Sequence, residues 1–543
     1  MVCLLTSCGD ESMKNMKAPK LPVAMLVACA LALPGGAAAQ EDAGSAADAG
    51  KREFFMGLLN EGKTLSDRGY YYEACVAFNG ILERGEDVEN YFREAEYQMA
   101  VNLHNLGLVY SSFTYFARIV DAGDSHPYYA QVLPWLNQIS TQVPGFQGVK
   151  EYMSVYDVET YPAEMKNDIA FTVGQFFYTQ DDLENALRVL AVVDAKDEEH
   201  YLRAKYLEGA IYARLNKAKE SLNAFKEILR YVAASVAPSA DARKFKDRSI
   251  LAIARIFYST RDFDKALKYY DEIEKYSTSW LQSLFEKSWA FYRLGNYERS
   301  MGNLHTLNSP YFEEQYYPES RVVQAVILFS NCRYEDAIVV VDEFVREYDD
   351  LRKELNAQLQ QNEDPADFYY WLAGLSQKGK GFSFKLKRIF NLALMDKKLH
   401  KLFSFILALD GEEVLLESMR NSAVQKDLAE RLLGELVTYR ELAIGEVGEQ
   451  ARARLDQKRK ELQRLVSAAM KVKFEALNAL KETIEGKREA SRETGESAGW
   501  TIDRDDQHLA WPFDGEYWKD ELDSYLFRVE NRCPEKKQAE SAK

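Results

Sequence analysis

Histidine and cysteine, which often act in catalysis or bind metals, are sparse in this 543-residue chain and show no catalytic spacing. The six histidines form no His-Glu-x-x-His motif, no Cys/His cluster and no other metal-ligand pattern; they are His104, His126, His200, His305, His400 and His508. No complete phosphate-binding or dinucleotide-binding glycine motif occurs. We interpret His104 and His305 as packed or surface residues. The sequence therefore predicts a protein that is not an enzyme and has no metal or cofactor site.

The six cysteines also show no spacing typical of a metal site or of a disulfide framework. Cys3, Cys8 and Cys29 lie in a segment that we expect to be removed if cleavage follows Ala39, which leaves Cys75, Cys332 and Cys533. This odd number suggests neither a disulfide framework nor a metal site. Cys75 and Cys332 occupy positions typical of a helical core, where free cysteine is common. Cys533 is a candidate for an intermolecular bond, but we expect an unpaired thiol.

The residues best suited to binding a partner lie near the C-terminus, in WPFDGEYWKDELDSYLFRVENRC (511–533). Large aromatic side chains bind strongly in grooves, so this segment supplies the candidate partner-docking residues: Trp511, Phe513, Tyr517, Trp518 and Tyr525. Residues 525–530 alternate as in a strand or in an extended peptide that lies along a surface. Two hypotheses remain open. The segment folds back on the protein itself, or it docks on a partner.

The composition favours a folded protein that does not bind nucleic acid. Hydrophobic residues make up 47% of the chain and aromatic residues 13%, which is enough for packed cores. The net charge of −16 repels nucleic acid and anionic lipid.

The N-terminus has the order of a secretory signal peptide, predicted to span residues 1–39. Three lysines precede an apolar run, residues 21–33, and small residues before Gln40 provide a cleavage site. The run is too short for a comfortable membrane span, so we expect none in the mature chain. An alternative is a lipid anchor, since residues 26–29 resemble a bacterial lipobox with Cys29 as the lipidated residue. Residues 40–50 are predicted to be a flexible linker.

From residue 51 a helical pattern repeats along the chain. A small or short residue recurs with a larger apolar residue three positions before it and four after it, as in Tyr71, Ala74 and Phe78. The central residues are Ala74, Ser112, Val149, Ala186, Ser221, Ala266, Ser300 and Ala337. Successive centres are 34 to 38 residues apart, except for one interval of 45 that contains an insertion at 232–244. Small residues also recur near aromatics about nine residues earlier, as in Gly209 with Tyr212. This period predicts stacked helical hairpins.

The strings AKYLEGAIYARLNKAKESLNAFKEIL and AIARIFYSTRDFDKALKYYDEIEK carry the pattern best, and over residues 51–345 the chain resembles the tetratricopeptide repeat (TPR) family. The resemblance implies an all-α fold, a solenoid of about eight helical hairpins with a concave protein-binding groove, and no chemistry. It also implies that Ala74, Ala186, Gly209, Tyr212, Ser221, Ala266, Ser300 and Ala337 are repeat-packing residues.

After residue 345 the period ends. We predict capping helices over 346–410, a long helical or coiled-coil-like region over 411–490, and an aromatic-rich segment and tail over 491–543. In the long region an apolar stripe that includes Leu455, Leu462, Ala469 and Ile484 is expected to face a partner helix, for which residues 342–361 are a candidate. Residues 451–490 carry eleven Lys and Arg against six Asp and Glu, which gives a local charge of +5. This charge indicates a solvated face, a contact with the acidic solenoid, or a contact with an acidic partner or an anionic surface.

Together these features predict a non-catalytic scaffold of a Gram-negative cell envelope, periplasmic or attached to the outer membrane, that binds other envelope proteins. Its ending is similar to that of exported repeat proteins of gliding and predatory bacteria, which implies a motility or secretion machine. Two alternatives are a lipid-anchored outer-membrane assembly factor and a cell-wall module that holds glycan on the aromatic side chains of residues 500–518. The sequence does not predict the oligomeric state.

Overall fold

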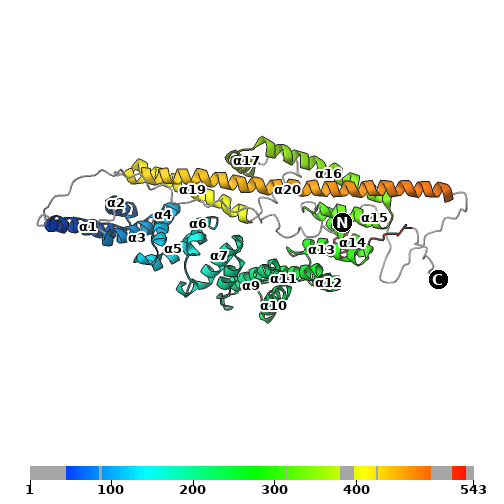
Figure 1. The fold of residues 1–543 in the computed structure, drawn as a ribbon, viewed down its shortest axis with the longest axis horizontal. Helices are drawn as coiled ribbons and strands as arrows, with labels where there is room; N and C mark the ends of the chain where they lie inside the picture. The colour runs from blue at the N-terminus through cyan, green and yellow to red at the C-terminus, as the bar shows by residue number, and fades with distance from the viewer. Residues whose placement is uncertain are drawn as a thin grey trace. The chain divides into compact units, whose positions relative to one another are not determined.

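The computed structural model describes residues 44–84, 89–312, 315–378, 397–422, 426–490 and 517–533. Every regular element in these ranges is a helix (Figure 1). The first eight α-helices are α1 (Gly44–Asp67), α2 (Tyr71–Leu82), α3 (Glu89–Asn105), α4 (Val109–Ala122), α5 (Tyr129–Gln142), α6 (Gln147–Met153), α7 (Lys166–Thr179) and α8 (Leu183–Leu190). The next eight are α9 (Glu198–Arg214), α10 (Ala218–Ala234), α11 (Ala240–Ser259), α12 (Phe263–Asp271), α13 (Trp280–Arg293), α14 (Tyr297–Leu307), α15 (Glu319–Ser330) and α16 (Tyr334–Gln361). Three more follow: α17 (Pro365–Lys378), α19 (Lys397–Ser422) and α20 (Asp427–Ala490).

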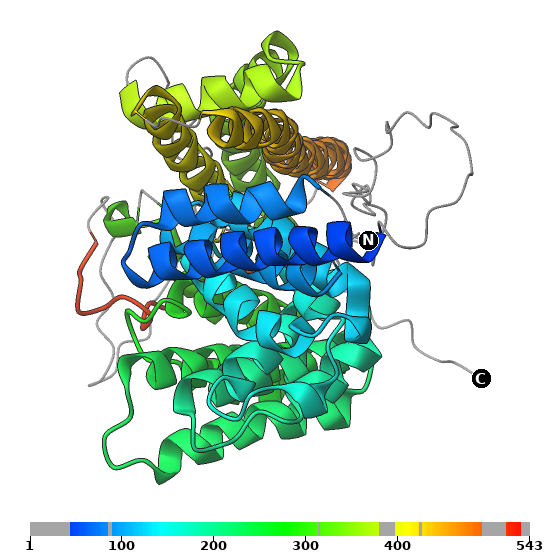
Figure 2. The same cartoon turned by 90° about the vertical axis from the view of Figure 1, so that its left-hand side faces the viewer.

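The contacts divide the chain into two compact units. The first unit contains α1 to α4, which pack in sequence order, with α1 beside α2 (Figure 2). The second contains α9 to α20. Helices α5, α6, α7 and α8 contribute residues to both units.

Consecutive helices pair in the order that the repeat predicts, and the fold is a TPR-like array of helical hairpins. Each of the eight predicted central residues lies in the second helix of a pair, from Ala74 in α2 to Ala337 in α16. The side chains of all eight are fully buried: Ala74, Ser112, Val149, Ala186, Ser221, Ala266, Ser300 and Ala337. Burial at this position explains its size limit, because a larger side chain would hold the two helices apart.

Where the central residue is serine, its hydroxyl donates to a carbonyl of the preceding helix. Ser112 donates to Ala100 at 2.9 Å, Ser221 to Gly209 at 2.7 Å, and Ser300 to Ser288 at 2.7 Å. The acceptor is twelve residues earlier in each pair, so the contact repeats with the hairpin. The bond satisfies a hydroxyl that would otherwise be buried at a cost.

The first helix provides a small residue where the second helix places an aromatic ring. An added Cβ at Gly209 would lie 2.7 Å from the ring of Phe225, and Gly62 has the same relation to Phe78. Tyr212, the other predicted packing residue of this hairpin, is partly exposed. Because glycine has no side chain, the aromatic ring of the second helix can pack directly against the backbone of the first helix.

The turns within the hairpins share one conformation. A residue with positive φ lies five positions before the central residue in seven of the pairs: Gly69, Gly107, Asp181, Asn216, Arg261, Gly295 and Cys332. The next residue donates its N–H to a carbonyl five positions back, as Tyr70 does to Leu65 at 2.9 Å and Arg333 to Leu328 at 3.0 Å. This is the Schellman arrangement, which caps the first helix and reverses the chain.

The second unit is completed by α20, which packs along α16, α17 and α19. Helices α16 and α20 run antiparallel, since Arg452 of α20 donates to the Leu359 carbonyl of α16 at 3.1 Å while Lys473 of α20 pairs with Asp342 of α16. The predicted partner segment 342–361 thus lies against α20. Leu455, Leu462 and Ala469 are buried, as predicted, on the packed side of α20.

Several predicted boundaries differ from the structure. Helix α1 begins at Gly44, inside the predicted linker 40–50, and α19 runs through residue 410, where we predicted a domain boundary. Ile484, assigned to the buried stripe, is 47% exposed. The buried stripe ends because α16 begins at Tyr334. Asp342 of α16 pairs with Lys473, so the antiparallel α16 does not extend along the last turns of α20. The predicted signal peptide and Cys29 lie outside the described residues.

Candidate functional site

The C-terminal segment 517–533, here called the strap, crosses the outer side of α14 as an extended chain. Tyr311 and Tyr276 donate from their hydroxyls to the carbonyls of Tyr517 and Lys519, at 3.3 and 3.2 Å. Further along, the Asp523 N–H donates to Thr306 Oγ1 at 3.1 Å. The described half of the aromatic segment therefore folds back on the protein's own repeats. Trp511 and Phe513 lie outside the described residues.

Main-chain hydrogen bonds continue to the end of the strap. The Phe527 N–H donates to the Glu298 carbonyl at 3.2 Å, and the Arg532 N–H donates to the Asn331 carbonyl at 3.0 Å. Gly302 makes this approach possible, because a Cβ there would overlap the carbonyl of Tyr525. A helix with a side chain at this position would hold the strap away from its surface.

The ring of His305 is the centre of an aromatic cluster beneath the strap. It stacks on Tyr517 with 4.4 Å between the ring centroids and lies edge-on to Tyr525 at 4.9 Å, with Phe527 at 6.0 Å. Burial, with a contribution from Arg321, lowers the pKa of His305, so the imidazole is neutral at pH 7. A neutral ring suits this contact, since it carries no charge that burial would penalise. The interpretation of His305 as a packed residue agrees with this position.

The strap alternates between packed and exposed side chains. Tyr525 and Phe527 are partly buried and Val529 is 9% exposed, whereas Leu526 is 53% exposed. The predicted alternation is present, as an extended peptide rather than as a strand. Trp518 remains 46% exposed. One ion pair adds to these contacts, since Lys287 Nζ lies 3.5 Å from Asp523 and 2.6 Å from Asp271.

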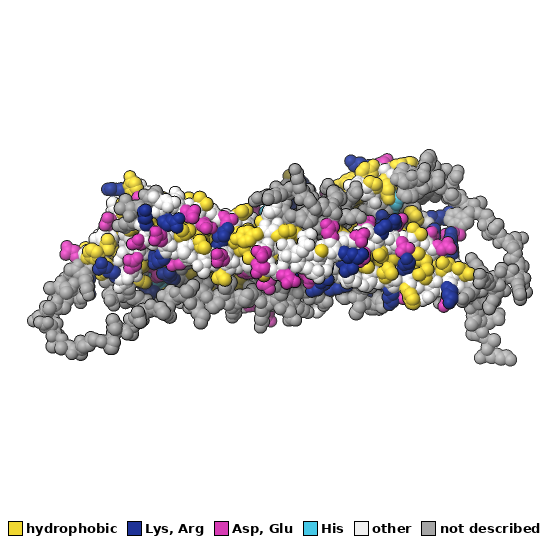
Figure 3. Space-filling view, turned by 90° about the horizontal axis from the view of Figure 1, so that it is seen from above, with side chains coloured by type: hydrophobic (Ala, Val, Ile, Leu, Met, Phe, Trp, Pro, Cys, Tyr) yellow, Lys and Arg dark blue, Asp and Glu magenta, His cyan; other side chains and the backbone are white. Residues whose placement is uncertain are grey.

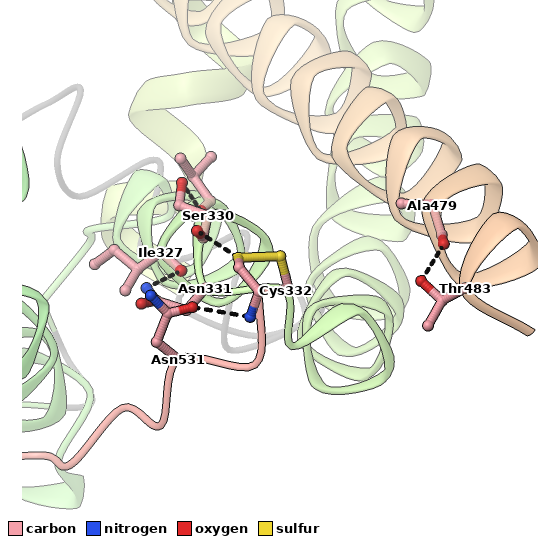
Figure 4. Close-up of a disulfide and its surroundings, with 9 residues drawn as sticks. Ile327, Ser330, Asn331, Cys332, Ala479, Thr483 and Asn531 are labelled. Carbon is pink, nitrogen blue, oxygen red and sulfur yellow. Dashed lines mark hydrogen bonds between the residues drawn. A yellow bond between two sulfur atoms is a disulfide. The ribbon is translucent and has the colours of Figure 1, made fainter. Parts of the chain in front are cut away.

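Cys533 forms a disulfide with Cys332, so the prediction of an unpaired thiol is wrong (Figure 4). Cys332 is not a core residue either, because it occupies the left-handed turn between α15 and α16 with φ of 56°. Sequence reasoning missed the pair because the two residues are 201 positions apart and only the path of the strap brings them together. Cys75 is a buried free thiol, as predicted, and burial raises its pKa.

A second surface lies on the outer side of α20. Met470, Phe474, Leu477 and Ile484, here called the α20 apolar stripe, are exposed by 46%, 66%, 46% and 47%. Their spacing of four, three and seven residues is that of a coiled-coil seam, in which Lys481 takes the remaining position. The space-filling view shows hydrophobic side chains scattered among charged ones along one face of the molecule (Figure 3). The pattern was present in the sequence, but it lay beside the stripe that faces α16 and was overlooked.

One cluster of charged groups in the described ranges joins neighbouring helices. The guanidinium of Arg255 on α11 donates hydrogen bonds of 2.6 to 3.0 Å to the Glu286 carboxylate on α13. The hydroxyl of Tyr270 donates to the same carboxylate at 3.1 Å. Among the described residues, no group of three or more His, Cys, Asp or Glu is placed to hold a metal ion.

No helix in the described ranges is both long and apolar enough to cross a membrane. A Gly-x-Ser-x-Gly string at 495–499 lies outside the described residues. It comes after α20 in the sequence, whereas the nucleophile of an α/β-hydrolase follows a strand.

No protein-family model matches the chain, and no curated protein is significantly similar to it. Solved structures with a similar fold are remote. A tetratricopeptide repeat protein from Parabacteroides merdae is 11% identical, with 54% of this chain and 92% of that chain covered and a TM-score of 0.25. The apo form of RapI is 11% identical, with 71% and 97% covered and a TM-score of 0.31. The apo quorum sensor NprR from B. thuringiensis is 11% identical, with 73% and 100% covered and a TM-score of 0.27. Similarity at this level carries no conclusion about what this chain binds.

Proposed function

We propose that this protein is a non-catalytic scaffold of the bacterial cell envelope that binds protein partners. The observation that carries the proposal is the α20 apolar stripe. Large apolar side chains that stay exposed at seam spacing mark a surface for another helix, because a monomeric protein gains nothing by leaving them in water. The TPR-like hairpins and the long antiparallel helices hold this stripe on a rigid frame.

The chemistry around the stripe specifies the kind of partner. Residues 451–490 carry a net charge of +5 within a chain of net charge −16. A positively charged region favours a partner with acidic residues. The partner that fits best is therefore an amphipathic helix with an apolar stripe and acidic flanks. A second copy of α20 fits less well, since it would bring two regions of the same net charge together.

Val339 on α16 extends the same surface. It is 56% exposed and lies three residues before Asp342, which pairs with Lys473 beside the stripe. A helix laid on the stripe would contact α16 as well as α20. The bound partner would thus be the third helix of a bundle.

The export of the protein belongs to the same proposal. The basic, apolar and small-residue order of residues 1–39 supports secretion across the inner membrane. The similarity of the ending to repeat proteins of gliding bacteria favours a motility or secretion machine as the assembly served. N-terminal sequencing of the mature protein tests the route. A start at Gln40 supports a soluble periplasmic protein, a lipidated Cys29 supports the outer-membrane alternative, and an uncleaved chain contradicts export.

Photo-crosslinking in the native host tests partner binding. A photoreactive amino acid placed at Leu477 should form an adduct with an envelope protein, through a peptide that is acidic and amphipathic. Phe474→Ser should reduce the adduct at least tenfold, because the change removes the most exposed apolar side chain of the stripe. The matched control is Val236→Ser, at a fully exposed position in the connection between α10 and α11.

Three results would contradict the proposed partner. They are the absence of any adduct, an adduct to another copy of this chain, and an adduct that Phe474→Ser leaves unchanged. Far-ultraviolet circular dichroism of the variant checks that its helices are intact.

A further inference from the structure

The face of α14 under the strap has the features of a peptide-binding site. This α14 face consists of Glu298, Gly302, His305 and Thr306. It binds the main chain through the Glu298 carbonyl and the Thr306 hydroxyl, and it binds side chains through the His305 ring. Main-chain hydrogen bonds provide affinity and alternate side-chain contacts provide specificity in the recognition of extended peptides.

The fit between face and strap is specific in shape. Gly302 removes the side chain that would collide with the Tyr525 carbonyl, and the nearest atoms to an added Cβ all belong to the strap. Tyr525 and Phe527 then turn toward His305, and Val529 is buried two residues further on. The face therefore accepts an extended segment with aromatic residues at alternate positions followed by a β-branched residue.

The strap occupies this face as a ligand would. It makes no regular secondary structure in residues 517–533, and its hydrogen bonds to α14 and to the turn after α15 join residues about 200 positions apart. Twenty-six residues, 491–516, separate it from α20. An occupant that belongs to the same chain binds intramolecularly, and an independent ligand must compete with it. The Cys332–Cys533 disulfide makes the attachment covalent and prevents such exchange.

We propose that the α14 face is a binding site for an extended aromatic peptide, that the strap is its built-in occupant, and that reduction of the Cys332–Cys533 disulfide opens the site to a partner segment of the same chemistry. The reductant is a dithiol. It supplies two electrons and two protons, becomes a disulfide itself, and leaves Cys332 and Cys533 as thiols. The α14 face shares no residue with the α20 apolar stripe, so its test is separate from that of the partner proposed above.

Peptide binding to the full-length chain tests the site. The probe is a synthetic peptide of residues 517–533 with Cys533→Ser and an N-terminal fluorophore. The receptor is a full-length released variant, Tyr525→Ser/Phe527→Ser/Cys533→Ser, whose own strap has lost its anchors. Fluorescence anisotropy should show binding at least tenfold tighter than to the oxidised wild-type chain. A probe that carries Tyr525→Ser and Phe527→Ser should not bind.

A matched pair of glycine substitutions in the released variant locates the site. Gly302→Ala should weaken peptide binding at least tenfold, because its Cβ occupies the position of the Tyr525 carbonyl. Gly434→Ala, also within a helix but with open space around it, should leave binding unchanged. A folded released variant that fails to bind overturns the proposal. Equal binding by the oxidised wild type overturns it too, as does an unchanged affinity with Gly302→Ala.

Hydrogen exchange of the wild-type chain tests the disulfide without any substitution. After treatment with a dithiol, the amides of Phe527 and Arg532 should exchange at least tenfold faster, while those in the middle of α14 keep their protection. Exchange in the strap that does not respond to reduction contradicts the proposed release.

Discussion

At the scale of single residues, the conformation of one turn position explains what the hairpins share. Seven turns place a left-handed residue five positions before the buried centre, and three of these seven residues are glycine. Asn216 and Asp181 are also suited to this conformation, but Arg261 and Cys332 are not. Cys332 adopts the left-handed conformation in a turn that places its sulfur next to the strap, where it forms the disulfide with Cys533.

A partly buried carboxylate, that of Glu319 at the N-terminal end of α15, makes stability depend on pH. Burial, with a contribution from the nearby Glu461 on α20, raises the pKa of Glu319 to about 7. Because the folded-state pKa lies above the unfolded one, the uncharged acid is favoured in the fold. The stabilisation is fully present below about pH 4.5 and is lost as the pH rises through about 7.

Glu319→Gln should remove this dependence. The wild type should lose on the order of 1–2 kcal/mol of unfolding free energy between pH 5 and pH 8 that the variant retains, with allowance for partial exposure to solvent. Urea denaturation at each pH measures the difference. Glu335→Gln, at an exposed position on α16, serves as the control and should follow the wild type. Parallel pH profiles for wild type and Glu319→Gln would show that Glu319 does not cause the effect.

At the scale of elements, α20 is held by close contacts of its backbone as well as by its buried stripe. Gly448 lies against the Pro365 carbonyl, at the first residue of α17, so that α17 and α20 approach closely. Phe405 of α19 also lies edge-on to Tyr439 of α20, with 6.1 Å between the ring centroids. Both contacts fix where the long helix lies.

Gly448→Val should separate α17 from α20. The added side chain has no space, so we expect a loss of about 1–3 kcal/mol of unfolding free energy and faster hydrogen exchange in α17. Gly434→Val changes the same helix at an open position, and it should show only the smaller effect of the valine on helix propensity. If the two variants lose equal stability, the close contact with Pro365 does not contribute.

At the scale of the whole molecule, the disulfide connects the end of the repeats to the end of the described chain. Its two cysteines are 201 residues apart, so it closes a loop that contains α16 to α20. A crosslink across a long loop stabilises the fold mainly by restricting the unfolded chain. The stability of the intact protein should therefore depend on redox conditions.

Cys332→Ser/Cys533→Ser should unfold at lower urea concentration than the oxidised wild type, with a loss of about 2–4 kcal/mol. A dithiol should lower the stability of the wild type to that of the double variant, and should leave the double variant unchanged. The control Cys75→Ala keeps the disulfide and should still respond to the dithiol, although it loses some core packing. A wild type that is insensitive to reduction would contradict this role.

The sequence by itself determined the helical hairpins, their order and the burial of their eight central residues. Those features depend on local periodicity, and a side chain at a fixed interval on a helix meets the same neighbour in each repeat. The pairing of α16 with α20 also followed from an apolar stripe. Only the tertiary structure decided the disulfide, the path of the strap over Gly302 and His305, and the exposure of Phe474 and Ile484. These depend on residues far apart in the chain, or on which face of α20 the neighbouring helices cover, and local periodicity alone decides neither.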